Sequence, residues 1–257
     1  MASPTFSITG IVVGHTKLGE TDMIITILAE DGSQYKAVAK GARKPTSTFA
    51  SRLELFSVAT ILLAQGKNLD IVKEARLVTG NACLRSDYLL SSAASPIVEL
   101  LAKATFQDQP TPRLFELAKR ALEELPAASE PLAITLATLL KLLAFLGFRP
   151  TFQECVSCGS ALDLQAGGSQ AFSYFDGGSI CPHCIAEHET TYLDAGMLAW
   201  CNGLLYTTLE EASKYELLAQ TLVQSFTFVN EWIKLHLGVN MRSITYLFKN
   251  ALFPNEV

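Results

Sequence analysis

The sequence lacks the features that mark export or insertion into a membrane. Its first residues carry no basic segment and no apolar core of the kind found in signal peptides. The most apolar stretch, 132–146, contains Lys141 and is shorter than the roughly 20 apolar residues that a membrane-spanning helix needs. We therefore expect a cytoplasmic protein with no membrane contact, in which 132–146 is a buried core helix.

Catalytic signatures are also missing. The chain contains neither Gly-x-x-x-x-Gly-Lys-Ser/Thr, which binds phosphates, nor Gly-x-Ser-x-Gly, which presents a nucleophilic serine. His15 and His236 stand alone, and the adjacent glutamates at 123–124 and 210–211 fall on expected helices, where neighbours in sequence point to different sides. The sequence therefore predicts that the protein is not an enzyme.

Charge is sparse as well. Charged residues make up 18% of the chain, and the formal net charge is −5. A protein coated for nucleic-acid binding would be basic overall, so any such contact has to come from a local basic patch.

What the sequence does have is two Cys-x-x-Cys pairs, with 22 residues between them. A two-residue gap lets both thiolates of a pair turn toward one ion, so two such pairs have the spacing of a tetrahedral zinc site. A short hairpin around Phe172 and Tyr174 is expected to bring the second pair back to the first. Four thiolates fill the coordination shell, which predicts one structural zinc ion rather than a catalytic one. The predicted ligands are Cys155, Cys158, Cys181 and Cys184.

Other interpretations compete with this one. Four unligated thiols would fit a reducing compartment, whereas disulfides would require export. His183 or His188 could replace a cysteine ligand, although the set of four makes this unnecessary. A nucleobase deaminase would need a His-x-Glu motif, which the chain lacks. Cys83 and Cys201 have no partner at ligand spacing and are expected to be small buried side chains.

The first 80 residues alternate short β-type runs with turns. The runs are rich in β-branched and aromatic residues, and Asp31-Gly32 between two of them is a hairpin signal. Gly14 is expected to end the first run. Five short strands in this length fit a closed barrel of the OB-fold type, although a generic five-stranded sheet fits the pattern too. The expected strands are 6–13, 23–29, 34–39, 57–64 and 69–78.

From about residue 82 the pattern changes to helices, so the expected fold class is α+β. We expect residues 1–80 to form the OB-fold, 81–149 and 191–257 an all-helical domain, and 150–190 an inserted four-cysteine zinc knuckle. Thr111 is a candidate cap ahead of Pro112, and Gly147 is expected to end the apolar helix. The expected helices are 87–107, 112–125, 131–147, 195–206, 215–237 and 242–252.

A basic stretch stands out from this acidic chain. Residues 36–52 hold five cations and no acidic residue, together with hydroxyl side chains that can contact phosphates. The pattern fits a DNA-binding loop and a solvated surface loop equally well. Phe49 and Phe56 are candidate stacking residues, and Phe56 fits the core equally well. The candidate DNA-binding residues are Lys36, Lys40, Arg43, Lys44 and Arg52.

The chain also contains a combination of short segments: 19–22 (Gly-Glu-Thr-Asp), 39–44, 53–56, 146–150, the two cysteine pairs and 241–243. Taken together, these segments resemble the bacterial recombination-mediator family RecO. They follow one another along the whole chain in the order barrel, helices, zinc knuckle, helices, and their combination is specific although each alone is weak. The four cysteines are similar to those of the metal-bearing members.

The resemblance implies a DNA repair and recombination mediator with no catalytic site, associated with the bacterial nucleoid during repair. Members of the family bind single- and double-stranded DNA and anneal complementary strands. With their partner RecR they help load the recombinase RecA onto strands coated by single-stranded-DNA-binding protein, whose acidic C-terminal tail they also bind. The net charge of this chain is acidic for an annealing protein. The alternative is therefore an adaptor that binds protein partners and contacts DNA only weakly.

Overall fold

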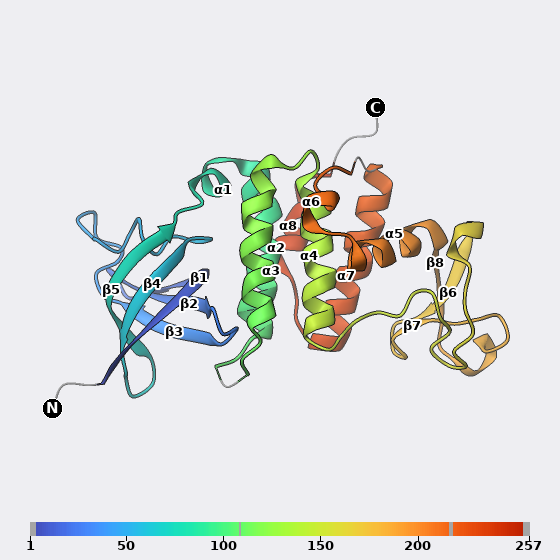
Figure 1. Cartoon of the computed structure of the whole chain (residues 1–257), viewed down its shortest axis with the longest axis horizontal. Helices are drawn as coiled ribbons and strands as arrows, with labels where there is room; N and C mark the ends of the chain where they lie inside the picture. Colours follow the sequence, from blue (N-terminus) through green and yellow to red (C-terminus); the bar gives the residue numbers. More distant parts are fainter. Residues whose placement is uncertain (1–3, 108, 216–217, 254–257) are drawn as a thin grey trace. The chain divides into compact units, whose positions relative to one another are not determined.

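The computed structural model describes residues 4–107, 109–215 and 218–253, and it divides into two compact units, Met1–Pro126 and Ala127–Val257 (Figure 1). The first unit holds a β-barrel and three helices. The second holds the remaining helices and the segment with the paired cysteines. The domain boundaries expected from the sequence at residues 80, 149 and 190 stay predictions.

The first unit begins with a closed five-stranded barrel. Around the barrel the strands follow the order β1-β2-β3-β5-β4, and β4 pairs with β1 to close it. Strands β3 and β5 pair in parallel, and all the other neighbours pair antiparallel. This arrangement confirms the expected OB-fold. The strands are β1 (Thr5–Leu18), β2 (Asp22–Ala29), β3 (Gln34–Ala39), β4 (Val58–Ala64) and β5 (Asp70–Thr79).

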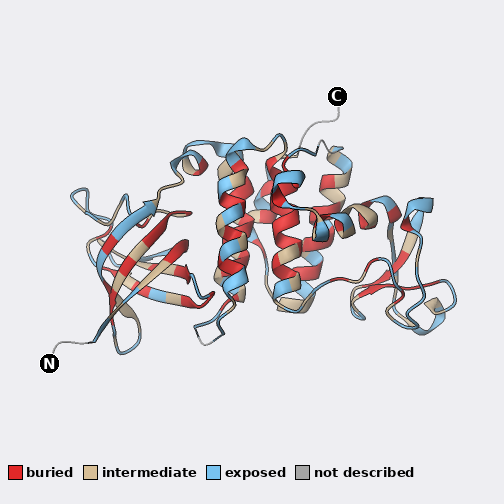
Figure 2. Ribbon diagram, viewed as in Figure 1, coloured by how far each residue is buried: buried red, intermediate tan, exposed pale blue. Residues whose placement is uncertain are grey.

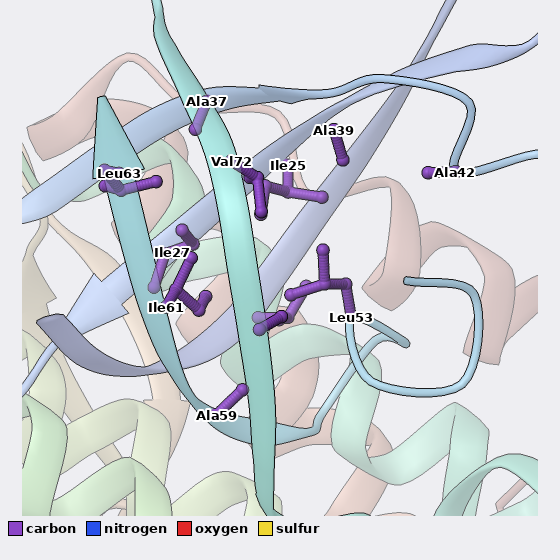
Figure 3. Close-up of a cluster of buried hydrophobic side chains, with 12 residues drawn as sticks. Ile25, Ile27, Ala37, Ala39, Ala42, Leu53, Ala59, Ile61, Leu63 and Val72 are labelled. Atoms are coloured by element: carbon purple, nitrogen blue, oxygen red, sulfur yellow. The ribbon is translucent and has the colours of Figure 1, made fainter. Parts of the chain in front are cut away.

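Small and branched aliphatic side chains fill the barrel interior (Figure 3). Alternate residues of each strand point inward, as the pleat of a β-strand requires. Ala42 and Leu53 belong to the same buried cluster, although they lie in the connection between β3 and β4. Both ends of that connection are therefore anchored in the core.

Strand β1 is longer than expected, because Gly14 does not end it. The strand continues to Leu18, and its register with β2 shifts between Val12 and Gly14, which leaves Val13 as the extra residue of a bulge. A glycine inside a strand often marks such a bulge rather than the end of the strand.

Three helices follow the barrel: α1 (Ala82–Ser86), α2 (Tyr88–Ala104) and α3 (Pro112–Glu124). The carboxylate of Asp87 caps α2 by accepting from the N–H of Leu90 at 2.9 Å. The expected helix 87–107 is too long, because the backbone becomes extended at Thr105. Thr111 occupies the N-cap position of α3 but its side chain makes no capping hydrogen bond, so only Pro112 at the first turn is confirmed.

The core of the second unit is α4 (Pro131–Phe145), in which twelve of fifteen residues are buried (Figure 2). The apolar stretch is therefore a core helix, as expected. The left-handed backbone of Gly147 (φ +88°) ends it, and the N–H of Phe148 donates to the carbonyl of Leu143 at 2.8 Å. No described helix is long and apolar enough to cross a membrane.

The other helices of this unit are α5 (Ala195–Tyr206), α6 (Leu209–Ala212), α7 (Ala219–Leu237) and α8 (Arg242–Lys249). The expected helix 215–237 begins too early: Tyr215 precedes α7, and residues 216–217 lie outside the described residues. Single turns of 3-10 helix lie at Leu125–Ala127, Leu164–Ala166 and Ile185–Glu187.

The segment between α4 and α5 folds around a small antiparallel sheet of order β7-β6-β8. Its strands are β6 (Ser169–Ser173), β7 (Gly178–Ser179) and β8 (Thr191–Asp194), and the β6–β7 hairpin confirms the expected turn. The fully buried ring of Phe172 lies 5.4 Å from the ring of Phe228 and 5.9 Å from that of Trp232, both on α7. Aromatic packing therefore fixes the segment to the helices of its own unit.

Candidate metal centre and nucleic-acid surface

The four predicted cysteine ligands come together in the second unit. Their sulfur atoms all lie within 4.8 Å of one another, and Cys158 Sγ lies 3.7 Å from Cys181 Sγ. Zinc–sulfur bonds of about 2.3 Å in a tetrahedron place sulfur atoms about 3.8 Å apart, so the cluster has the dimensions of a tetrathiolate site. The group Cys155, Cys158, Cys181 and Cys184 could therefore hold a metal ion.

Tight turns shape each pair. The N–H of Gly159, in a left-handed conformation (φ +76°), donates to the carbonyl of Cys155, and the N–H of Cys184 donates to the carbonyl of Cys181. The pairs also contact each other, because the N–H of Cys181 donates to Cys155 Sγ at 3.3 Å. Buried Ala171 and Ile180 complete an apolar shell around the two buried thiols. These hydrogen bonds shape the turn of each pair and join the second pair to Cys155.

The local environment gives the cysteine thiols different pKa values. Burial favours the neutral form of Cys155, but the N–H groups of Cys181, Cys158 and Ser157 outweigh it and lower the pKa of Cys155 to about 6. The hydroxyl of Ser157 lowers the pKa of Cys184, but the neighbouring thiols and burial raise it to about 12. Four adjacent thiolates repel one another, so a cation at their centre is what would stabilise all four.

Neither histidine near the cysteines belongs to this cluster. His188 Nδ1 lies 2.9 Å from the Asp176 carboxylate, and His183 is exposed. Within the described residues, the cysteines alone form the metal-binding group. Of the two remaining cysteines, Cys201 is buried as expected, whereas Cys83 is exposed, contrary to the expectation.

The predicted basic loop is ordered rather than free. The guanidinium of Arg43 donates to the carbonyl oxygens of Gly19 (3.0 Å) and Glu20 (2.9 Å), in the turn between β1 and β2. The N–H of Arg43 also donates to the carbonyl of Thr21. Together with the buried Ala42, these bonds hold the start of the loop against the β1–β2 turn.

Lys40 and Lys44 lie beside this contact, and both are exposed. Between them the N–H of Gly41 donates to the Asp22 carboxylate at 2.7 Å. That hydrogen bond, together with the charges of Lys40 and Lys44, lowers the pKa of Asp22. The structure therefore brings Lys40, Arg43 and Lys44 to the same edge of the barrel, with Asp22 as their acidic neighbour.

The other two predicted cations, Lys36 and Arg52, line two different depressions of the barrel. Exposed Lys36 lies on β3 and lines a depression with Lys67 and the exposed Phe106. Arg52 lines a groove on β1, β4 and β5 together with Lys73 and Arg76, two cations that the sequence reasoning missed.

The aromatic candidates also differ from each other. Phe56 is buried and serves the core, whereas Phe49 is half-buried at the groove that Arg52 lines. Only Phe49 therefore stays a candidate for stacking on a base.

The acidic excess of the chain lies outside the barrel. Residues 1–80 contain nine Lys and Arg against seven Asp and Glu, whereas residues 81–257 contain eleven against eighteen. Although the whole chain has a net charge of −5, residues 1–80 carry a small excess of positive charge. A negative total does not prevent this part of the chain from attracting a polyanion.

Comparison with known proteins agrees with this organisation. A family model described as "Recombination protein O N terminal" matches residues 1–81, and one described as "Recombination protein O C terminal" matches residues 85–244.

Individual relatives carry the name DNA repair protein RecO. That of Desulfitobacterium hafniense (strain DSM 10664 / DCB-2) is 32% identical over 208 residues, which are 79% of this chain and 75% of the relative. That of Bifidobacterium longum (strain DJO10A) is 38% identical over 188 residues, 70% of this chain and 73% of the relative. That of Bacillus cereus (strain AH187) is 34% identical over 172 residues, 67% of each chain.

Proposed function

The chain belongs to the RecO family of DNA repair proteins, and on this basis we propose that it is a recombination mediator that binds single- and double-stranded DNA and catalyses no reaction. It anneals complementary strands and, with RecR, helps load RecA onto strands coated by single-stranded-DNA-binding protein. It also binds the acidic tail of that protein. It acts in the cytoplasm and, during repair, at the nucleoid.

The observation that carries this proposal is the cationic edge of the barrel. OB-folds bind oligonucleotides through the face of strands 2 and 3 and through the loops between strands 1–2 and 4–5. Arg43 fastens the β1–β2 turn to the loop that carries Lys40 and Lys44, so both ammonium groups stand next to such a loop. Lys36 adds a cation on β3. These groups can contact phosphates without reading sequence, as a mediator that acts on any strand requires.

Zinc is the metal that we propose for the cysteine centre. Among divalent ions, zinc is the one that proteins bind with four thiolates in a closed structural site. Residues 155–184 contain no Lys or Arg, so they offer no phosphate contact of their own. We therefore assign the ion a structural role, which is to fold the segment between α4 and α5.

Strand binding as a function of salt tests the assignment. The double variant Lys40→Ala and Lys44→Ala removes two exposed charges and leaves the Arg43 hydrogen bonds in place. The slope of log K against log salt for single strands should fall by about 0.7 for each lost phosphate contact. The variant Lys214→Ala and Lys234→Ala, which removes two exposed charges from the second unit, should leave the slope unchanged. An unchanged slope in the Lys40/Lys44 variant would exclude this edge as a DNA-binding surface.

The acidic excess of residues 81–257 favours a second candidate, an adaptor that binds protein partners and contacts DNA weakly. Strand titrations with and without RecR distinguish the two. The mediator binds strands tightly by itself at physiological salt, whereas the adaptor acquires affinity only in the complex.

A further inference from the structure

The β1, β4 and β5 wall of the barrel carries a groove that the proposed DNA surface does not include. Its volume is about 570 Å³, and the loop before β4 forms one of its sides. Its cations are Arg52, Lys73 and Arg76, and its one acidic side chain is Glu74. In the order β1-β2-β3-β5-β4, strands β4 and β5 lie across the barrel from β2. The groove lining contains no residue of β2 or β3 and neither Lys40 nor Lys44.

A bulge in β5 brings Lys73 into this groove. Leu62 of β4 pairs with Glu74 and Leu63 pairs with Val72, so Lys73 is the extra residue. Regular alternation would turn Lys73 into the barrel, because its neighbour Glu74 points outward. Instead Val72 and Ala75 are buried, whereas Lys73, Glu74 and Arg76 are all exposed. Bulges commonly re-aim a side chain in this way next to functional sites.

The other cations are arranged to receive an anion. Arg52 Nη1 donates to the carbonyl of Ala75 at 3.1 Å, which fixes the guanidinium at the rim while its other N–H groups can donate elsewhere. Among the described residues, Arg52, Lys73 and Arg76 form no ion pair. Three cations against one carboxylate leave the groove with an excess of positive charge.

The remaining lining suits a strand of nucleic acid. Thr48 brings a hydroxyl group that can donate to a phosphate oxygen, whereas the Thr60 hydroxyl is hydrogen-bonded to that of Thr9 at 3.2 Å. Half-buried Phe49 brings an aromatic face on which a base can stack. Cations, a hydroxyl group and one aromatic ring in an open groove fit a phosphodiester chain better than a compact metabolite, which would need an enclosed pocket.

We infer that this groove is a second binding surface for the phosphodiester backbone of single-stranded nucleic acid, separate from the edge that carries Lys40 and Lys44. The inference rests on the proposed DNA-binding function and extends it. A barrel with two such surfaces can hold two stretches of backbone at once, either two strands or two parts of one.

The test compares three double variants on a thymidine oligonucleotide of about 30 nucleotides, longer than the 4–16 nucleotides that one OB-fold occupies. The groove variant is Lys73→Ala with Arg76→Ala, both at exposed positions, and Arg52 is left intact because of its hydrogen bond to Ala75. The edge variant is Lys40→Ala with Lys44→Ala. The control is Lys119→Ala with Arg120→Ala on α3, which removes the same charge from the same unit.

We expect the groove variant to lower the salt slope by about 1.4, or about 0.7 for each residue, and to add to the effect of the edge variant when the two are combined. The control should match the unmodified protein. A groove variant with an unchanged slope, beside an edge variant with a lowered slope, overturns the second surface and leaves the proposed function intact. Unchanged slopes in both variants overturn the DNA-binding assignment itself. A circular dichroism spectrum identical to that of the unmodified chain establishes that each variant is folded.

Discussion

The guanidinium group of Arg43 donates to the main-chain carbonyl oxygen of Glu20 at 2.9 Å, across the gap between two loops of the barrel. A second bond, to the carbonyl of Gly19, uses the same nitrogen. The residue is thus a structural tie between the β1–β2 turn and the basic loop, as well as a positive charge. Arg43 therefore supplies both a positive charge and a hydrogen-bonded link between two loops at this edge of the barrel.

This coupling predicts that Arg43→Lys weakens strand binding although the net charge is unchanged. A single ammonium group on a flexible stem is a poorer bridge between two carbonyls than a planar guanidinium, so the loop loses part of its order. The affinity for a single strand should fall, while the salt slope stays nearly constant. Lys40→Arg, which breaks no observed tie, is the matched control and should bind normally. Equal affinities for Arg43→Lys and the unmodified protein would show that the tie is dispensable.

Substitution of Asp22 should strengthen strand binding, in contrast to substitution of Arg43. Its carboxylate lies among the cations of this edge, and the pKa of Asp22 is lowered by the N–H of Gly41 and by Lys40 and Lys44. Asp22→Asn keeps an acceptor for Gly41 and removes the negative charge, so strand affinity should rise, within about fivefold. Asp22→Ala also loses the hydrogen bond and should gain less. Fluorescence anisotropy of a labelled strand measures both, and weaker binding by Asp22→Asn would contradict the electrostatic argument.

Removal of one ligand from each pair, with Cys155→Ser and Cys181→Ser, should abolish metal binding. Metal analysis should show the loss of about one zinc per chain. Because binding of a structural ion is coupled to folding, amide exchange should accelerate in residues 150–194 and remain slow in the barrel. Cys83→Ser, at an exposed thiol outside the cluster, is the control. Retention of zinc by the double variant would show that the ligands are misassigned.

Two glycines of the second unit should respond in opposite directions to alanine. Gly147 has a left-handed backbone (φ +88°) with no neighbouring atom in the way, so Gly147→Ala should destabilise the unit by about 1 kcal/mol through backbone strain alone. Gly203 lies inside α5 with open space around it, so Gly203→Ala should stabilise it by about 0.5–1 kcal/mol. Urea unfolding measures both. Equal effects of the two substitutions would contradict this explanation.

Lys141 predicts a dependence of stability on pH. Its ammonium group donates to the carbonyl of Leu205 at 2.8 Å, and burial lowers its pKa below the ordinary value of 10.5. Between the lowered pKa and 10.5 the unfolded chain binds more protons than the folded chain, so this residue makes stability rise with pH in that window. The free energy of unfolding of the unmodified chain should therefore increase relative to that of Lys141→Met as pH rises from 7 to about 10. Lys17→Met, at an exposed position, controls for the loss of a lysine. A difference that does not change with pH would contradict the prediction.

The sequence was sufficient for the strands and for the cysteine cluster, because both depend on short-range spacing. Alternation marks a strand, and a gap of two residues marks a pair of ligands. It was insufficient for the bulges, since the extra residues Val13 and Lys73 look like any other strand position. For that reason the end of β1 was misplaced and the groove cations Lys73 and Arg76 were missed. Proximity along the chain also suggests one patch of five cations, whereas Lys36 and Arg52 line two different depressions of the barrel.

The one parallel pairing of the barrel is also its shortest seam. Strands β3 and β5 meet only through Ala37 opposite Asp70 and Val38 opposite Ile71, whereas every antiparallel pair has at least six such partners. Parallel pairing is slightly weaker per residue, and this seam has the fewest paired residues of the barrel. During folding, the antiparallel pairs of the barrel would form first, and the pairing of β3 with β5 would form last. In the folded protein the same pairing would open first, and one of its two strands, β3, carries Lys36.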